Sequence, residues 1–144
     1  MDLFLAFCQG VGLALAAGAF GGASGRRGPI GVMLLAFALV GGAVMMGASL
    51  ATEDHPAWPG WPVGALLAAL SFFVVRGIAE GAAARPDAGP WTGALLALAA
   101  LVLAGLSLLP ISPISLVAFA ALAWLALGRR SRAGRKYEGL RSLR

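Results

Sequence analysis

The chain has 144 residues, of which 60% are hydrophobic and only 12% are charged, and its mean hydropathy is +0.87. A soluble globular domain carries about 25% charged residues, so this composition excludes a soluble domain with a polar surface. The formal net charge is +5. Because the basic residues border apolar runs, we assign them to membrane orientation and to contact with anionic lipid headgroups, and we expect no nucleic-acid partner.

The first two apolar segments, residues 3–24 and 30–51, predict an antiparallel pair of transmembrane helices. Each has about 22 residues, and about 20 are enough to cross the hydrocarbon core of a bilayer. A GRRGP turn at residues 25–29 separates them, and its two charges cannot lie in lipid. No basic residue precedes the first segment, so it lacks the positive region of a signal peptide and we expect it to remain as a span.

A third span is predicted over residues 63–84, after a loop that contains acidic residues and three prolines. Prolines disfavour a helix interior, so the loop separates the second and third helices. Trp58 and Trp61 are amphipathic rings of the kind that lie at a membrane–water boundary. Pro62 suits the first turn of the third helix, where its missing N–H group is not needed.

Residues 91–109 and 113–127 predict two further helices, whose depth in the membrane stays open. The last segment has about 15 residues and rises about 23 Å, which is short of a hydrocarbon core of about 30 Å. It either spans a locally thinned bilayer or forms a re-entrant hairpin with the segment before it. We therefore expect an all-α transmembrane bundle over residues 1–128, with five helices or with four plus a re-entrant hairpin.

The distribution of basic residues predicts the orientation of the bundle. Lys and Arg follow the first, third and fifth segments, whereas the loops after the second and fourth carry none. Cytoplasmic loops collect Lys and Arg, so we expect a multi-pass protein of the cell inner membrane with its N-terminus outside and its C-terminus inside. This asymmetry disfavours a dual-topology dimer, and we expect a homo-oligomer to have parallel subunits.

Small residues four positions apart predict close helix packing. Gly18 and Gly22 have this spacing in the first segment, and Gly77 and Gly81 have it in the third. Such pairs let helix backbones approach closely, which drives association where lipid removes the hydrophobic effect between helices. The two ridges pack either within one chain or between subunits.

Three polar residues within the spans are the candidate functional residues. Arg76 and Glu80 lie four residues apart on one helix face, so they can pair, and ionisable residues in a span suggest function. They form either an interfacial anchor or structural pair, or the lining of an inner vestibule or lipid-headgroup site. Gln9 can hydrogen-bond across helices or contribute to a pathway.

The sequence offers no constellation for catalysis or for a metal. Cys8 is the only cysteine and His55 the only histidine, so no disulfide, haem pair or clustered metal ligands can form within one chain. Neither a Ser/His/Asp set within reach nor a phosphate-binding glycine loop is evident. We expect no enzymatic activity, no metal and no cofactor.

The C-terminal segment, residues 129–144, contains seven basic residues. As a helix it would place Ala133, Tyr137 and Leu140 along one side with basic residues beside them, which is typical of a helix on an anionic leaflet. The alternative is a simple positive-inside stop signal. The residues expected to contact the lipid surface are Arg129, Arg130, Arg132, Arg135, Lys136 and Arg141.

The last nine residues, KYEGLRSLR at positions 136–144, resemble the ending of a family of small bacterial integral membrane proteins. That family is known only as a domain of unknown function. The resemblance implies a bacterial inner-membrane protein, and it implies no activity and no site residues.

Two functions of different class follow from these patterns. The first is a small oligomeric channel or transporter for an ion or small solute, favoured because a compact, Gly-rich bundle has no evident soluble output domain. The second is a non-transporting membrane module that binds lipid or organises a partner protein through its basic tail. Sparse polar residues in the spans disfavour transport of large polar solutes.

Overall fold

The computed structural model describes residues 3–52, 54–84, 91–107 and 115–128, which form five helices and no strand. The prediction of an all-α fold is confirmed for these residues. The helices are α1 (Leu3–Gly22), α2 (Pro29–Ala51), α3 (Gly60–Ala83), α4 (Trp91–Ser107) and a last helix, Ser115–Gly128. Among the described residues, α1, α2 and α3 are long and apolar enough to cross a membrane, whereas α4 and the last helix are shorter.

Local turn chemistry explains where the first three helices begin and end. Gly25 and Gly28 have φ of +60° and +82°, a left-handed backbone conformation that favours glycine, and they enclose the two arginines of the α1–α2 turn. Pro29 then occupies the first turn of α2. Helix α3 begins at Gly60, slightly before the predicted start at residue 63, because Pro62 is tolerated within a first helical turn.

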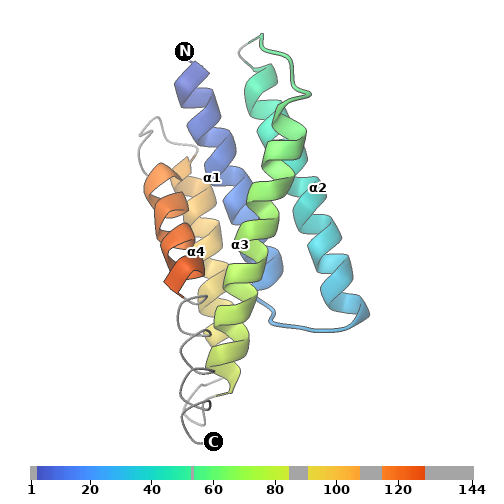
Figure 1. The fold of residues 1–144 in the computed structure, drawn as a ribbon, viewed down its shortest axis with the longest axis vertical. Helices are drawn as coiled ribbons and strands as arrows, with labels where there is room; N and C mark the ends of the chain where they lie inside the picture. The colour runs from blue at the N-terminus through green and yellow to red at the C-terminus, as the bar shows by residue number, and fades with distance from the viewer. Residues whose placement is uncertain (1–2, 53, 85–90, 108–114, 129–144) are drawn as a thin grey trace, which may run out of the picture.

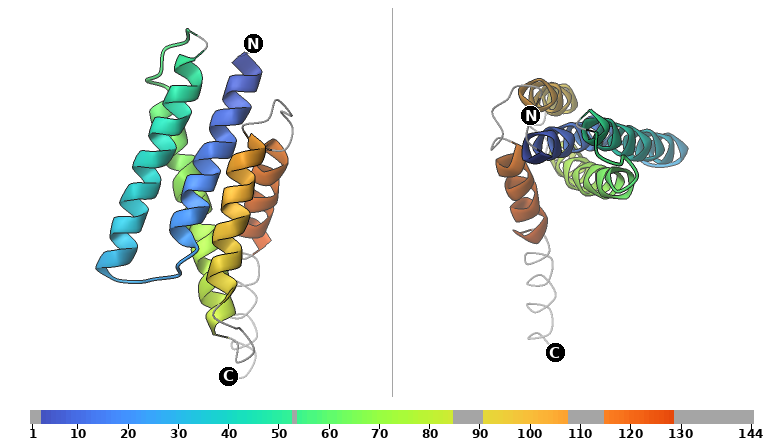
Figure 2. Two further views of the ribbon diagram at one scale, coloured as in Figure 1. Left: turned by 180° about the vertical axis from the view of Figure 1, so that it is seen from behind. Right: turned by 90° about the horizontal axis from the view of Figure 1, so that it is seen from above.

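Helix α1 lies at the centre of the bundle. It contacts α2, α3 and α4, and the view along the bundle places α2 and α3 on one side of it and α4 and the last helix on the other (Figure 2). Successive helices run in alternating directions, so the α1–α2 turn lies at the same end as the C-terminal end of α3 (Figure 1). The α2–α3 loop lies at the opposite end (Figure 1).

Glycine and alanine form the closest contacts between helices. A Cβ atom added to Gly18 of α1 would overlap the carbonyl group of Ala68 on α3. Between α2 and α3, a Cβ added to Gly42 would lie 2.5 Å from the Cβ of Ala68 and 2.7 Å from the carbonyl oxygen of Gly64. The helix backbones therefore touch directly, which is how helices associate strongly in lipid.

The buried polar side chains are satisfied by backbone carbonyl groups. Ser71 of α3 is fully buried, and its hydroxyl donates to the carbonyl oxygen of Leu15 on α1 at 2.7 Å. Ser49 donates to the carbonyl oxygen of Met45 in its own helix at 2.9 Å. Within the described part of the chain, no buried side-chain nitrogen or oxygen lacks a hydrogen-bond partner. The Ser71 bond adds a polar link between α1 and α3 at their tight crossing.

The outer surface is more apolar than that of a soluble protein. Each helix turns large hydrophobic side chains outward, among them Phe20, Phe37, Val44, Leu66, Phe73, Leu98 and Trp124. Small residues inside and large apolar residues outside reverse the usual order of a water-soluble fold, where extended apolar patches are rare. Exposed Trp61 lies in the first turn of α3 at one end of the bundle, and exposed Trp91 is the first residue of α4 at the other.

Candidate functional site

Three charged side chains form an ion cluster at the end of the bundle where α3 finishes. The guanidinium of Arg27 donates to both carboxylate oxygens of Glu80, with Nε–Oε1 at 3.0 Å and Nη2–Oε2 at 2.6 Å. Nε of Arg76 donates to Oε1 of the same carboxylate at 3.0 Å. The cluster therefore holds two positive charges and one negative charge, and it joins residues that are 53 positions apart.

The elements that carry these residues explain how they meet. Arg76 and Glu80 lie one helical turn apart on α3, so their side chains project over one face. Arg27 lies in the turn that Gly25 and Gly28 shape between α1 and α2. Its hydrogen bonds to Glu80, together with the negative charge of that carboxylate, raise the pKa of Arg27, which therefore stays positively charged. The Arg27–Glu80 pair ties the turn to α3.

Arg76 occupies the junction of three helices. A Cβ added to Gly22, the last residue of α1, would lie 3.0 Å from the backbone nitrogen of Arg76. A Cβ added to Gly31, in the first turn of α2, would lie 3.8 Å from Nη1 of Arg76. The Arg76 side chain is 23% exposed, so it is largely sheltered from the surroundings.

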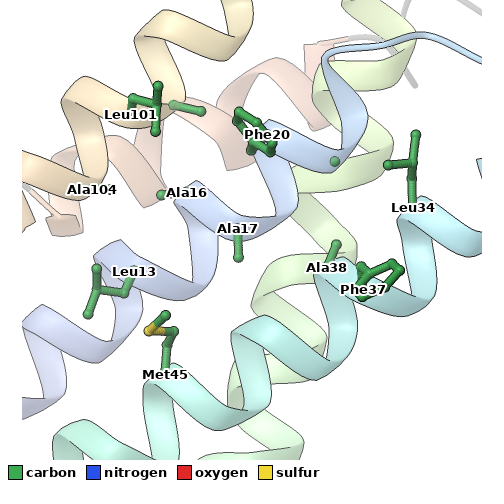
Figure 3. Close-up of a pocket in the computed structure, with 12 residues that line it drawn as sticks. Leu13, Ala16, Ala17, Phe20, Leu34, Phe37, Ala38, Met45, Leu101 and Ala104 are labelled. Carbon is green, nitrogen blue, oxygen red and sulfur yellow. The ribbon is translucent and has the colours of Figure 1, made fainter.

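A lateral groove opens between α2 and α4, with α1 as its floor. Its volume is about 500 Å³, and small-molecule sites in proteins occupy about 300–1,000 Å³. Figure 3 shows residues from all three helices around it. The groove is lined by Leu13, Ala16, Ala17, Phe20, Gly21, Leu34, Phe37, Ala38, Met45, Ala100, Leu101 and Ala104. These residues contribute no hydrogen-bonding side chain, so the groove suits an apolar ligand.

One end of the lateral groove lies toward the end of the bundle that carries the ion cluster. Gly21 lines the groove, and the next residue, Gly22, lies against the backbone of Arg76. On α2, Leu34 lines the groove one helical turn beyond Gly31, which lies beside the Arg76 guanidinium. The groove therefore extends from the neighbourhood of the ion cluster toward the apolar middle of the bundle, and its own lining carries no charge.

The other predicted residues occupy separate places. Gln9 lies half-buried in the first half of α1, far along that helix from the ion cluster. Gly18 and Gly22 face α3, whereas a Cβ added to Gly81 would meet no described atom within 4 Å. Gly77 is half-buried on α3. The C-terminal residues expected to contact lipid, Arg129, Arg130, Arg132, Arg135, Lys136 and Arg141, lie outside the described residues, as does the KYEGLRSLR ending.

Sequence reasoning missed Arg27 and the groove. Arg27 was assigned only to orientation, although Arg27 and Glu80 both border the same predicted membrane surface, which is a signal that they could meet. The groove had no comparable signal, because its lining residues are ordinary apolar residues of three different helices. Only the way these helices splay apart creates it.

Comparison of the chain with models of protein families, with curated proteins and with solved structures found no match. Among the described residues, no group of three or more His, Cys, Asp or Glu side chains could hold a metal ion. The ion cluster and the lateral groove are therefore the features from which we argue function.

Replacing Glu80 with glutamine should release the α1–α2 turn from α3. The substitution keeps the size of the side chain but removes the charge to which Arg27 and Arg76 donate. We expect backbone amide hydrogen exchange in residues 23–28 to become about three- to tenfold faster, since charge-assisted bonds are lost at an exposed site. As the control, Arg26→Gln should leave exchange unchanged, because no ion pair joins the Arg26 side chain to a described residue. Equal exchange in Glu80→Gln and the unmodified chain would show that the cluster does not hold the turn.

Proposed function

We propose that this chain is a multi-pass integral membrane protein that holds a membrane lipid in its lateral groove, as a module that does not itself conduct solutes. The outward-facing hydrophobic side chains support a lipid environment, because water would not tolerate so much exposed apolar surface. Lipid acyl chains are then the apolar ligands present in excess around the groove.

The observation that carries this proposal is the groove itself. Its lining extends along α1 from Leu13 to Gly21, a rise of about 12 Å at 1.5 Å per residue. An acyl chain can follow the lateral groove between α2 and α4 without burying any polar group. The adjoining ion cluster offers charge to a headgroup at one end.

We also propose the topology that the sequence favours. The end that carries Arg27 and Arg76 is assigned to the cytoplasm, together with the basic residues 129–144, because cytoplasmic loops collect Lys and Arg. This assignment puts the N-terminus outside the inner membrane. The inner membrane as location is also what the resemblance of the ending to a bacterial membrane family implies.

A channel or transporter is less well supported by the geometry. The contact between Gly18 and Ala68 closes the α1–α3 interface, and the contact between Gly42 and Gly64 closes the α2–α3 interface. A polar pathway at these two interfaces is therefore disfavoured, and a pathway between subunits of a parallel homo-oligomer stays the alternative. Ion flux into liposomes at several pH values tests this alternative, and a flux above that of empty liposomes would favour it over the lipid-binding module.

Filling the groove should remove lipid from it. Ala17 is half-buried on the groove floor, so Ala17→Phe places a ring where an acyl chain would lie. In detergent micelles that contain a phosphatidylcholine with a diazirine on its acyl chain, we expect photolabelling of α1 and α2 peptides to fall several-fold in this variant. The labelled peptides are identified by mass spectrometry.

The matched control is Ala99→Phe, which adds the same ring at an exposed position of α4 that does not line the groove. Its photolabelling should equal that of the unmodified chain. If labelling in the unmodified chain is spread evenly over all exposed helix faces, or if both variants label alike, the groove does not hold lipid and the proposed function is wrong.

A further inference from the structure

We propose that the lipid held in the lateral groove is an anionic phospholipid, and that Arg76 binds its phosphate where the groove meets the ion cluster. This inference rests on the proposed function and names the chemical class of its ligand. It follows from three observations: which Arg76 nitrogens are already engaged, the net charge of the cluster, and the position of the groove relative to it.

Arg76 has donor capacity to spare. The Nε of Arg76 donates to Glu80, and among the described residues this is the ion pair that Arg76 forms. No described residue accepts a hydrogen bond from its two terminal nitrogens, and Nη1 lies near Gly31 in the first turn of α2. A planar guanidinium with two free nitrogens matches the oxygens of a phosphate, which it can bind in a bidentate manner.

The charge around this position favours an anion. Among the described residues, Glu80 neutralises only one of the two guanidinium groups in the cluster, so one positive charge of the cluster remains uncompensated. The N–H groups of Ile30 and Gly31 in the first turn of α2 have no partner within their own helix, so they can donate to an anion. A zwitterionic headgroup would bring a cation to the same place, which weakens its attraction.

The position of the groove fits a phospholipid rather than a free anion. The groove begins at Gly21 and Leu34 and continues toward Leu13 and Met45 in the middle of the bundle. The residue after Gly21 and the residue one helical turn before Leu34 are the two glycines that lie near Arg76. A lipid with its phosphate at Arg76 would therefore have an acyl chain directed along the groove. A soluble phosphate compound would gain nothing from this apolar wall.

The experiment is a competition in detergent micelles, with the diazirine-bearing phosphatidylcholine as probe. Unlabelled phosphatidylglycerol should displace the probe from α1 and α2 peptides at about one tenth of the concentration that unlabelled phosphatidylcholine requires, the preference expected for hydrogen bonds to an ionised group. In Arg76→Gln the two competitors should become equal within about twofold. As the control, Arg26→Gln removes a positive charge from the α1–α2 turn, and this variant should keep the preference for phosphatidylglycerol. Size-exclusion chromatography and thermal unfolding verify that each variant is folded.

The outcomes separate this inference from the proposed function. Groove labelling that both lipids displace equally well in the unmodified chain would overturn the phosphate site but leave the lipid-binding module intact, and this result needs no variant. A preference for phosphatidylglycerol that survives in folded Arg76→Gln would also overturn the role of Arg76. If the probe does not label the groove, or if the groove peptides are instead cross-linked to a second copy of the chain, both the phosphate site and the lipid-binding module are wrong.

Discussion

Replacing Gly18 with alanine is expected to destabilise the bundle by about 3 kcal/mol, at the upper end of the usual cost of overpacking. The added methyl group would overlap the carbonyl oxygen of Ala68 and lie 2.8 Å and 2.9 Å from the carbonyl carbon and the Cα of that residue. Because all three are backbone atoms, no side-chain rotation relieves the overlap, and α1 and α3 must move apart. The same movement would stretch the bond from Ser71 to the carbonyl group of Leu15. The free energy of unfolding is measured by titration with a denaturing detergent in mixed micelles.

Gly81→Ala is the matched control for this prediction. It makes the same change in α3 at a position where the added methyl group meets no described atom within 4 Å. Alanine is the better helix former, so we expect no loss and a gain of at most about 1 kcal/mol. Similar results for Gly18→Ala and Gly81→Ala would contradict a direct backbone contact between α1 and α3.

Replacing Phe72 with alanine is expected to cost about 2–4 kcal/mol, within or just below the range known for large-to-small changes in buried cores. Phe72 is the largest of the fully buried side chains, with 1% of its surface exposed, and its ring would lie 3.2 Å from a Cβ on Gly21. In lipid the loss comes mainly from van der Waals contacts and the cavity left behind, because the surroundings are as apolar as the core. Detergent-induced unfolding measures this change as well.

Phe73→Ala removes the same ring from the next residue of α3, which faces outward and is 57% exposed. The two rings contact each other edge-to-face, with centroids 5.6 Å apart, so either substitution loses this pair and the comparison isolates the cavity inside the bundle. We expect the Phe73 variant to lose less than about 1 kcal/mol, since lipid replaces its contacts. If the two variants lost equal stability, Phe72 would not be the central packing residue of α3.

Part of the candidate site could be predicted, and its limits have a physical cause. The spacing of Arg76 and Glu80 shows that they can pair, because residues four apart on a helix always share a face. The partnership of Glu80 with Arg27 depends on how α1, α2 and α3 pack, and 53 residues separate the two in the chain. The packing glycines illustrate the same limit. A Cβ added to Gly18 meets the backbone of α3, whereas one added to Gly81 meets no described atom within 4 Å, although both glycines belong to the same four-residue spacing.

The amino-acid sequence by itself determined that the chain is helical and apolar, and where its turns lie, because hydrophobic run length, proline and glycine act locally. It also determined which end of each segment carries positive charge. Only the tertiary structure decided that α1 lies at the centre, that Arg27 and Arg76 share one carboxylate, and that α2 and α4 stand apart over α1 to leave a groove. In the lipid environment that we propose, every face of these helices is apolar enough to be either buried or exposed, so hydrophobicity cannot select the contacts. The selection comes from backbone approach at glycine and alanine, which depends on the relative placement of whole helices.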